Sequence, residues 1–369
     1  MGYPRIDSRT VIVGPLADRK SKHHITDIHV DPDGPLPPAS PDQSKQIEML
    51  ANRIRTARSN NATVMLAYGA HLVKNGLVSV VTRMMETGWI THLATNGAGV
   101  IHDWEYAFHG MSEEDVRTHV AQGCFGTWDE TGRHTALAVL SGAVDGLGYG
   151  ESMGRMIVED GYQIPHHSQI QKALIDWSND PEDNEGMPAR AELLQTILRH
   201  NIASGRHTVE HPYRTYSLTG NAYRLKIPLT VHPSIGYDIV YTHPLVSGAA
   251  YGRAGIIDFH VFVEGVTRVD GGVFLSIGSS IMAPQVFEKA VSITNNLRRQ
   301  NKLRPLLPFI AVNDLIEEDW DWNVGEPPIH NPAYYNRMGK SFSRMGGELT
   351  YTAADNRLFM LHLCRHLTR

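Results

Sequence analysis

The chain has 369 residues, of which 41% are hydrophobic and 20% charged, a composition typical of a globular protein with a large core. Its formal charge of −5 argues against nucleic-acid binding as the main task. We expect no membrane contact and no secretion signal, because no stretch approaches the roughly 20 apolar residues of a membrane helix and the first residues lack an apolar core. The two cysteines exclude a disulfide framework, so we predict a cytoplasmic enzyme.

The N-terminal half predicts an arm followed by alternating helices and strands. Residues 1–41 are rich in proline, aspartate and histidine and are expected to be extended. A helix follows, because four apolar residues recur at the spacing of one helical face: Ile47, Leu50, Ala51 and Ile54. Apolar runs then predict a strand at 62–67, a helix at 77–86 and a strand at 90–95.

The same alternation resumes after an irregular middle section, in which an acidic segment near 176–190 is predicted to be a surface insertion. Four further strands are expected, at 227–231, 272–277, 308–312 and 348–352. Short apolar strands that alternate with helices are typical of a parallel sheet covered on both faces. The sequence therefore predicts an α/β fold, a doubly wound, mainly parallel and Rossmann-like sheet, in a single domain over 42–369.

Ligands of such sheets bind beyond the carboxyl ends of the strands. Five loops are expected there, at 68–75, 95–103, 278–284, 313–322 and 354–357. The second loop contains Gly97 and Gly99 between a strand and a helix, a pattern that suits phosphate binding. It lacks the third glycine of the dinucleotide motif, since His102 stands there, and a tight turn explains the two glycines equally well.

Several segments together resemble one enzyme family. Residues 63–105, which contain AYGAHLVKNG and ATNGAGVIHDWE, resemble the cofactor-binding segment of the deoxyhypusine synthase family, in order and without gaps. Further collinear matches are IPLTVHPSIG, GVFLSIGSSI, FIAVND and TAADNRLF. The resemblance covers most of 42–369, is weak in 106–215 and is absent from the arm.

The resemblance implies a cytoplasmic, NAD-dependent aminoalkyl transferase with sites at the dimer interfaces of a homotetramer. A polyamine would be oxidised by NAD, and its aminoalkyl group would pass through an imine on an enzyme lysine (a Schiff base) to an acceptor amine. The acceptor would be a protein lysine, as in hypusine formation, or a small diamine. The family's lysine motif matches Pro332 to Lys340, so Lys340 is the candidate; its structural alternative is an exposed loop lysine beside Gly339.

The resemblance also implies a set of cofactor contacts: Ala70, His71, Leu72, Val73, Lys74, Asn96, Gly97, Ala98, His102, Asp314, Leu315, Asp355 and Asn356. Asp355 is expected to accept hydrogen bonds from a ribose, as an acidic residue does in dinucleotide-binding folds. An N-cap of the last helix is the structural alternative for this aspartate.

The substrate contacts depart from the family pattern. The family's diamine-binding glutamate and tryptophan are Tyr334 and Met338 here, and an aspartate of the family falls on His232. Asp103 is retained, and Asp319 and Asp321 could restore negative charge. These six residues are the candidate substrate contacts. Because removal of carboxylates penalises a dicationic substrate, the amine donor and acceptor stay open.

Two other functions remain possible from the sequence. An NAD-binding protein without transferase activity would explain the missing diamine contacts. A metal-dependent hydrolase would use a histidine- and aspartate-rich cluster in the arm: His23, His24, Asp27, His29 and Asp31. No metalloprotease or zinc-finger spacing accompanies that cluster, so we expect no metal site.

Overall fold

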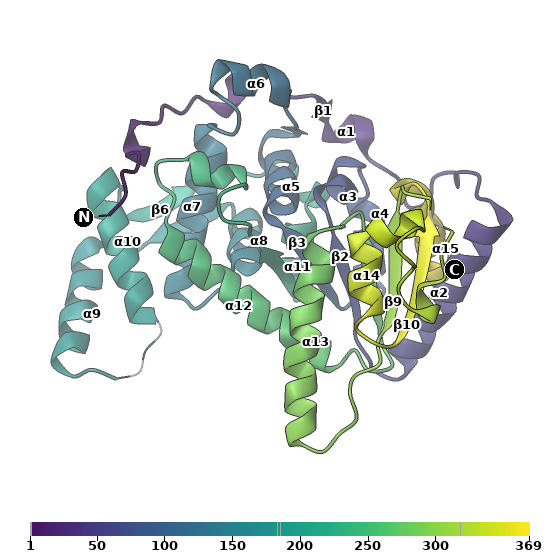
Figure 1. The fold of residues 1–369 in the computed structure, drawn as a ribbon. Helices are drawn as coiled ribbons and strands as arrows, with labels where there is room; N and C mark the ends of the chain where they lie inside the picture. The colour runs from purple at the N-terminus through teal and green to yellow at the C-terminus, as the bar shows by residue number, and fades with distance from the viewer. Residues whose placement is uncertain (1, 183, 185, 318) are drawn as a thin grey trace. The chain divides into compact units, whose positions relative to one another are not determined.

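The structure is a computed structural model that describes residues 2–182, 184, 186–317 and 319–369 (Figure 1). Its contacts divide the chain into two compact units. The sheet unit comprises Ile28–Val100, Asn221–His232 and Asp258–Arg369. The helical unit comprises 2–27, Ile101–Gly220 and Pro233–Ile257. No helix in the part of the chain that the structure describes is both long enough and apolar enough to cross a membrane.

A six-stranded sheet is the centre of the sheet unit. Its strands are β2 (Val64–Tyr68), β3 (His92–Asn96), β7 (Leu229–His232), β8 (Val273–Ile277), β9 (Phe309–Asp314) and β10 (Glu348–Ala353). Their order is β10-β9-β8-β2-β3-β7 and every neighbouring pair is parallel. When the six strands are numbered 1 to 6 along the chain and read from β7 to β10, their order is 3-2-1-4-5-6. This is the order of doubly wound dinucleotide-binding folds. The predicted fold class and its six strands are confirmed, with ends shifted by one or two residues.

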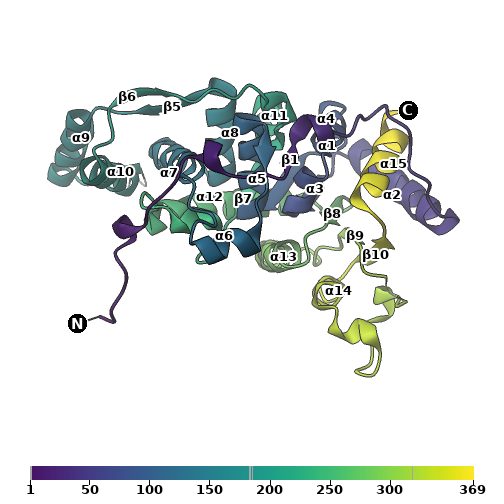
Figure 2. The same ribbon diagram turned by 90° about the horizontal axis from the view of Figure 1, so that it is seen from above.

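Helices cover both faces of this sheet (Figure 2). One face packs against α13 (Met282–Gln300), α14 (Arg337–Ser343) and the part of α12 (Gly248–Thr267) that starts at Asp258. On that face Phe274 stacks on Phe287 with ring centroids 3.8 Å apart. The other face packs against α2 (Pro41–Ser59) and α15 (Asn356–Thr368), and α4 (Val78–Glu86) packs against α15. A short helix, α3 (Ala70–Lys74), follows β2.

Helix α2 shows how local sequence sets these elements. Ser40 and Gln43 form a capping box, and Pro41 occupies the first helical turn, where its missing N–H costs no hydrogen bond. The predicted apolar face is buried against the sheet, with Ile47 and Ile54 at 0% exposure.

The helical unit consists mainly of helices that lie between β3 and β7 in the sequence. They are α5 (Gly97–His109, from Ile101), α6 (Val116–Gln122), α7 (Asp129–Val144), α8 (Tyr149–Glu159), α9 (His167–Asn179), α10 (Gly186–His200) and the first residues of α11 (Leu218–Leu225). A hairpin of β5 (Gly161–Ile164) and β6 (Gly205–Thr208) is antiparallel. The predicted acidic insertion joins α9 to α10, and its positions 183 and 185 lie outside the described residues.

The N-terminal segment is anchored within the helical unit. Short β1 (His23–His24) pairs with β4 (Met111–Ser112), just before α1 (Ile25–Ile28). Arg19 forms a two-bond ion pair with Glu105, with both N–O distances 2.7 Å and both side chains at most 2% exposed. Ser112 Oγ donates to the same carboxylate at 2.6 Å. This segment therefore holds a buried charge pair as well as extended backbone.

Candidate functional site

The strand order places a switch point between β2 and β8, where ligands of doubly wound sheets bind. The loops that leave these strands touch each other through glycines. A methyl group on Gly69 would overlap the carbonyl oxygen of Gly278, and Gly278 itself has a φ of +56°. Only glycine fits such a close approach, so the two loops pack backbone against backbone at the switch point, with Gly69 buried and Gly278 half-buried.

The predicted cofactor contacts after β2 lie on α3. Leu72 and Val73 are fully buried, so only their backbone atoms could meet a cofactor. His71 is exposed, and Ala70 and Lys74 are half-buried. The side chains of His71 and Lys74 are therefore the ones on this helix that a dinucleotide could reach.

The glycine loop after β3 has a packing explanation. Asn96 Oδ1 accepts a hydrogen bond from Gly99 N at 2.9 Å, which caps the start of α5. A methyl group on Gly99 would overlap Thr95 Oγ1, whose hydroxyl donates to Tyr68 O at 3.0 Å. These contacts account for Gly99 as a tight strand-to-helix turn, and the roles of Asn96, Gly97 and Ala98 toward NAD stay predictions.

His102 and Asp103 belong to the helical unit and are engaged there. His102 Nδ1 lies 2.7 Å from Ser112 Oγ. Asp103 is fully buried and accepts hydrogen bonds from Ser217 Oγ at 2.6 Å and Leu218 N at 2.7 Å, which caps α11. Burial raises the pKa of Asp103 despite these hydrogen bonds. Its carboxylate therefore has a structural role in this conformation.

The carboxyl ends of β9 and β10 bring together four polar residues of the sheet unit, Asn313, Asp314, Asp355 and Asn356. Asp314 Oδ1 accepts from Leu315 N at 2.7 Å, and Leu315 is 72% exposed. Asp355 caps α15 through Arg357 N at 2.8 Å, the structural alternative weighed from the sequence.

Asn313 and Asn356 link this edge to the switch point. Asn313 Nδ2 donates to Asn356 Oδ1 at 3.0 Å, and Asn356 Nδ2 lies 3.3 Å from the position of a methyl group on Gly278. Asn313 Oδ1 is buried and has no hydrogen-bond partner among the described residues. Sequence reasoning missed Asn313, although its place at the end of an apolar strand run was a usable signal.

A cavity of about 750 Å³ opens in the sheet unit beside these loops. Its walls come from the segments that follow β8 and β9 and from the segment that leads into α14. The described lining residues are Ser280, Ile281, Ile316, Glu317, Asp319, Asn331, Pro332, Ala333, Tyr335, Asn336, Arg337 and Met338. The predicted substrate contacts Asp319 and Met338 are thus in one cavity.

Among the residues that the structure describes, the charged groups that line this cavity are Glu317, Asp319 and Arg337. All three are exposed, and none makes a hydrogen bond or ion pair with another residue that the structure describes. Met338, in contrast, is 4% exposed and packs into the core. The cavity therefore combines an apolar surface with charged side chains of both signs that form no ion pair with a described residue.

Lys340 lies on α14, one helical turn after Arg337. Its Nζ is 3.2 Å above the ring centroid of Tyr334 and 3.9 Å from Glu326 Oε2, and its side chain is 16% exposed. Lys340 and Tyr334 are outside the set of described residues that line the cavity. The candidate nucleophile is thus next to the cavity in sequence but turned toward an aromatic ring.

Two remaining substrate candidates lie elsewhere in the sheet unit. Asp321 caps a short 3-10 helix through Asn323 N at 3.0 Å, and this hydrogen bond lowers the pKa of its carboxyl. His232 is buried at the end of β7, where its Nε2 is 3.1 Å from Thr230 Oγ1, and burial lowers its pKa to about 3.

The arm histidines form no metal centre within the described parts of the chain, where no group of three or more histidine, cysteine, aspartate or glutamate side chains could hold an ion. His24 Nδ1 instead lies 2.7 Å from Thr26 Oγ1 in the helical unit. His29 Nδ1 lies 3.4 Å from Ser79 Oγ in the sheet unit.

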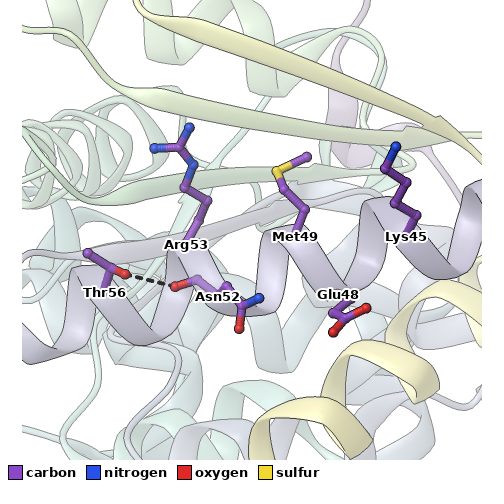
Figure 3. A pocket seen from close by; sticks show the side chains of 6 residues that line it. All are labelled: Lys45, Glu48, Met49, Asn52, Arg53 and Thr56. Carbon is purple, nitrogen blue, oxygen red and sulfur yellow. Dashed lines mark hydrogen bonds between the residues drawn. The ribbon is translucent and has the colours of Figure 1, made fainter.

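A second hollow follows one face of α2 (Figure 3). Six side chains rise from this single helix: Lys45, Glu48, Met49, Asn52, Arg53 and Thr56. Arg53 lies 4.9 Å from the ring centroid of Phe309 and pairs with Glu348. Because its described walls come from one helix, this hollow is a shallow surface groove rather than a convergent site.

Comparisons with known proteins find no matching family model and no matching curated protein. Solved structures resemble the chain at low identity. Unliganded AgrE is 14% identical with a TM-score of 0.43, and the match covers 90% of this chain and 34% of AgrE. An LOR/SDH protein from Methanococcus maripaludis S2 is 11% identical, with a TM-score of 0.41 and coverage of 92% and 73%. A protein described as a deoxyhypusine synthase, from Entamoeba histolytica, is 10% identical, with a TM-score of 0.35 and coverage of 89% and 90%. The chain thus spans about a third of the AgrE chain that it matches.

Proposed function

We propose that the protein is an NAD-dependent enzyme that oxidises an amine bound beside the switch point. The observation that carries this proposal is the 3-2-1-4-5-6 strand order, with loops after β2 and β8 that meet through glycines at the switch point. The neighbouring cavity carries two carboxylates, which would attract an ammonium group. An amine held there would lie beside a dinucleotide.

The residues around the switch point fit a dinucleotide. The half-buried backbone at Gly278, which carries no side chain, would let a pyrophosphate approach closely. Asp314 and Asp355 would accept hydrogen bonds from ribose hydroxyls, and the unpartnered Asn313 Oδ1 would accept one from the carboxamide of the nicotinamide. When bound, NAD supplies the hydride acceptor.

The aminoalkyl transfer that the family resemblance implies would run through Lys340. With NAD bound as the hydride acceptor, the donor would carry an iminium group at the carbon beside its nitrogen. Lys340 Nζ, unprotonated, would add to that carbon and expel the leaving amine, and an acceptor amine would then displace Lys340. Reduction of this last imine with the retained hydride would give the new secondary amine. For this chemistry the Lys340 side chain must change rotamer, so that Nζ leaves the Tyr334 ring and points toward the cavity. The same helix, α14, already contributes Arg337 to the cavity wall.

Changing Gly69 to alanine tests the cofactor site. We expect NAD affinity to fall roughly tenfold or more, because the added methyl group displaces the Gly278 loop. Titration of NADH fluorescence measures this effect. Gly252→Ala is the matched control, since a methyl group at Gly252 meets nothing within 4 Å. Unchanged NAD binding in Gly69→Ala would place the cofactor elsewhere.

Borohydride trapping tests transfer through Lys340. With NAD and a mixture of spermidine and 1,4-diaminobutane, we expect a reduced adduct on the peptide that contains Lys340. The adduct should be lost in Lys340→Arg and kept in Lys289→Arg, which changes an exposed lysine paired with Glu288. Mass spectrometry of the digested protein measures it.

The second candidate function is NAD binding without transfer. The observation that favours it is the contact of Lys340 with Tyr334 and Glu326, which holds an ammonium group well and a neutral amine poorly. NAD binding with no adduct from any amine in the trapping experiment would support this function over the first.

A further inference from the structure

The charges of the cavity beyond β8 and β9 restrict what it can bind. Glu317 and Asp319 bring two negative charges, and Arg337 brings one positive charge, from the other wall segment. A diamine that carries only positive charge would meet the carboxylates but would also be repelled by Arg337. A ligand with both an ammonium and a carboxylate group would pair with all three.

Arg337 is available for such a ligand. It makes no hydrogen bond or ion pair with another described residue, whereas Arg344, seven residues later, is held by Glu326 at 2.6 Å. A guanidinium binds a carboxylate through two parallel hydrogen bonds, which a diamine cannot offer. The apolar part of the wall, Ile281, Ile316 and Met338, suits a short aliphatic chain between the two charged ends.

We propose that this cavity binds a zwitterionic amino acid with a second amine at the end of its side chain, and that Arg337 selects the carboxylate. This inference rests on the proposed amine-oxidising function and specifies its substrate class. The ammonium group at the end of the ligand's side chain lies toward Glu317 and Asp319. Its α-carboxylate, with the α-ammonium group beside it, lies on Arg337.

The test compares two ligands that differ by one carboxylate. Ornithine and 1,4-diaminobutane have the same spacing between their two nitrogens, so their affinities isolate the contribution of the carboxylate. Calorimetry on the full chain saturated with NAD should show ornithine binding roughly tenfold or more tightly than the diamine. The preference should fall as salt is raised, because the three charges are exposed.

Variants at the two ends of the cavity give opposite patterns. Arg337→Met should remove the preference for ornithine and leave diamine binding equal or tighter, and Arg337→Lys should keep part of the preference. Glu317→Gln combined with Asp319→Asn should weaken both ligands. Melting curves check that each variant folds. A diamine that binds as well as ornithine, an unchanged ratio in Arg337→Met, or no binding of either amine overturns the inference.

The outcomes separate this inference from the function on which it rests. If NADH does not bind, the proposed function fails at the cofactor. If NADH binds and the diamine binds as tightly as ornithine, the amine-dependent function stands and only the assignment to Arg337 fails.

Discussion

Between pH 6.5 and 4 the protein should lose folding stability at a rate of about 1.4 kcal/mol per pH unit for each buried neutral histidine. His92 and His232 in the sheet unit are 2% and 8% exposed, and burial lowers the pKa of each to about 3. Burial also lowers the pKa of His134 to about 3, and those of His211 and His243 to about 4, in the helical unit.

Folding stability falls with falling pH because burial lowers the pKa of each of these histidines. In the unfolded chain a histidine binds its proton near pH 6.5, whereas in the folded chain it stays neutral until the pH nears its lowered pKa. Protonation therefore favours the unfolded state, and the stability present above pH 6.5 is lost as the pH falls toward 4. The cause at His92 is burial first, followed by electrostatic interactions with the nearby His232 ring and the Arg268 guanidinium.

Urea unfolding at a series of pH values measures this acid loss. The double variant His92→Leu/His232→Leu should show a shallower dependence on pH than the original chain, because two of the titrating groups are gone. His330→Gln is the matched control, since His330 is exposed. An acid limb equally steep in the double variant would mean that the two histidines are not buried in the neutral form.

Replacement of Arg19 by methionine should cost roughly 3–5 kcal/mol of unfolding free energy, because it leaves the buried Glu105 carboxylate without its ion-pair partner. Net stability of a domain is only about 5–15 kcal/mol, so this single change is expected to remove a large share of it. Ser112 and Thr131 also donate to Glu105, at 2.6 and 2.9 Å, but two hydroxyl groups do not replace a full positive charge.

A second change should restore most of that loss. In Arg19→Met/Glu105→Gln the buried carboxylate is replaced by a neutral amide of the same shape, so the uncompensated charge is removed. Arg9→Met controls for changes to the N-terminal segment, since Arg9 and Asp7 form an exposed pair, and should leave the urea midpoint unchanged. Wild-type stability in Arg19→Met alone would contradict the buried pair.

The fold was predictable because its signals are local. The strand runs at 62–67 and 272–277 are apolar for about the length of a buried parallel strand, and helix α2 carries its own cap and its own apolar face. The alternating order then restricts the chain to a doubly wound sheet, which the structure has.

The candidate site was predictable only in part. Asp319 and Met338 line the cavity, and their contact with substrate stays a prediction; Asp355 caps the last helix, which was its structural alternative. The role of Asp103 was hidden, because its partner Ser217 is 114 residues away. Arg337 was not predicted as a site residue, because an arginine at the start of a helix is ordinary unless the fold places it in a cavity.

The sequence by itself determined where strands and helices form, since burial periodicity and capping act over a few neighbouring residues. The tertiary structure alone decided that Gly69 meets Gly278, that Lys340 lies on Tyr334, and that Arg337 shares a cavity with Glu317. The physical reason is that close approach and charge pairing depend on distance in space, and chain folding brings together groups that no local pattern relates.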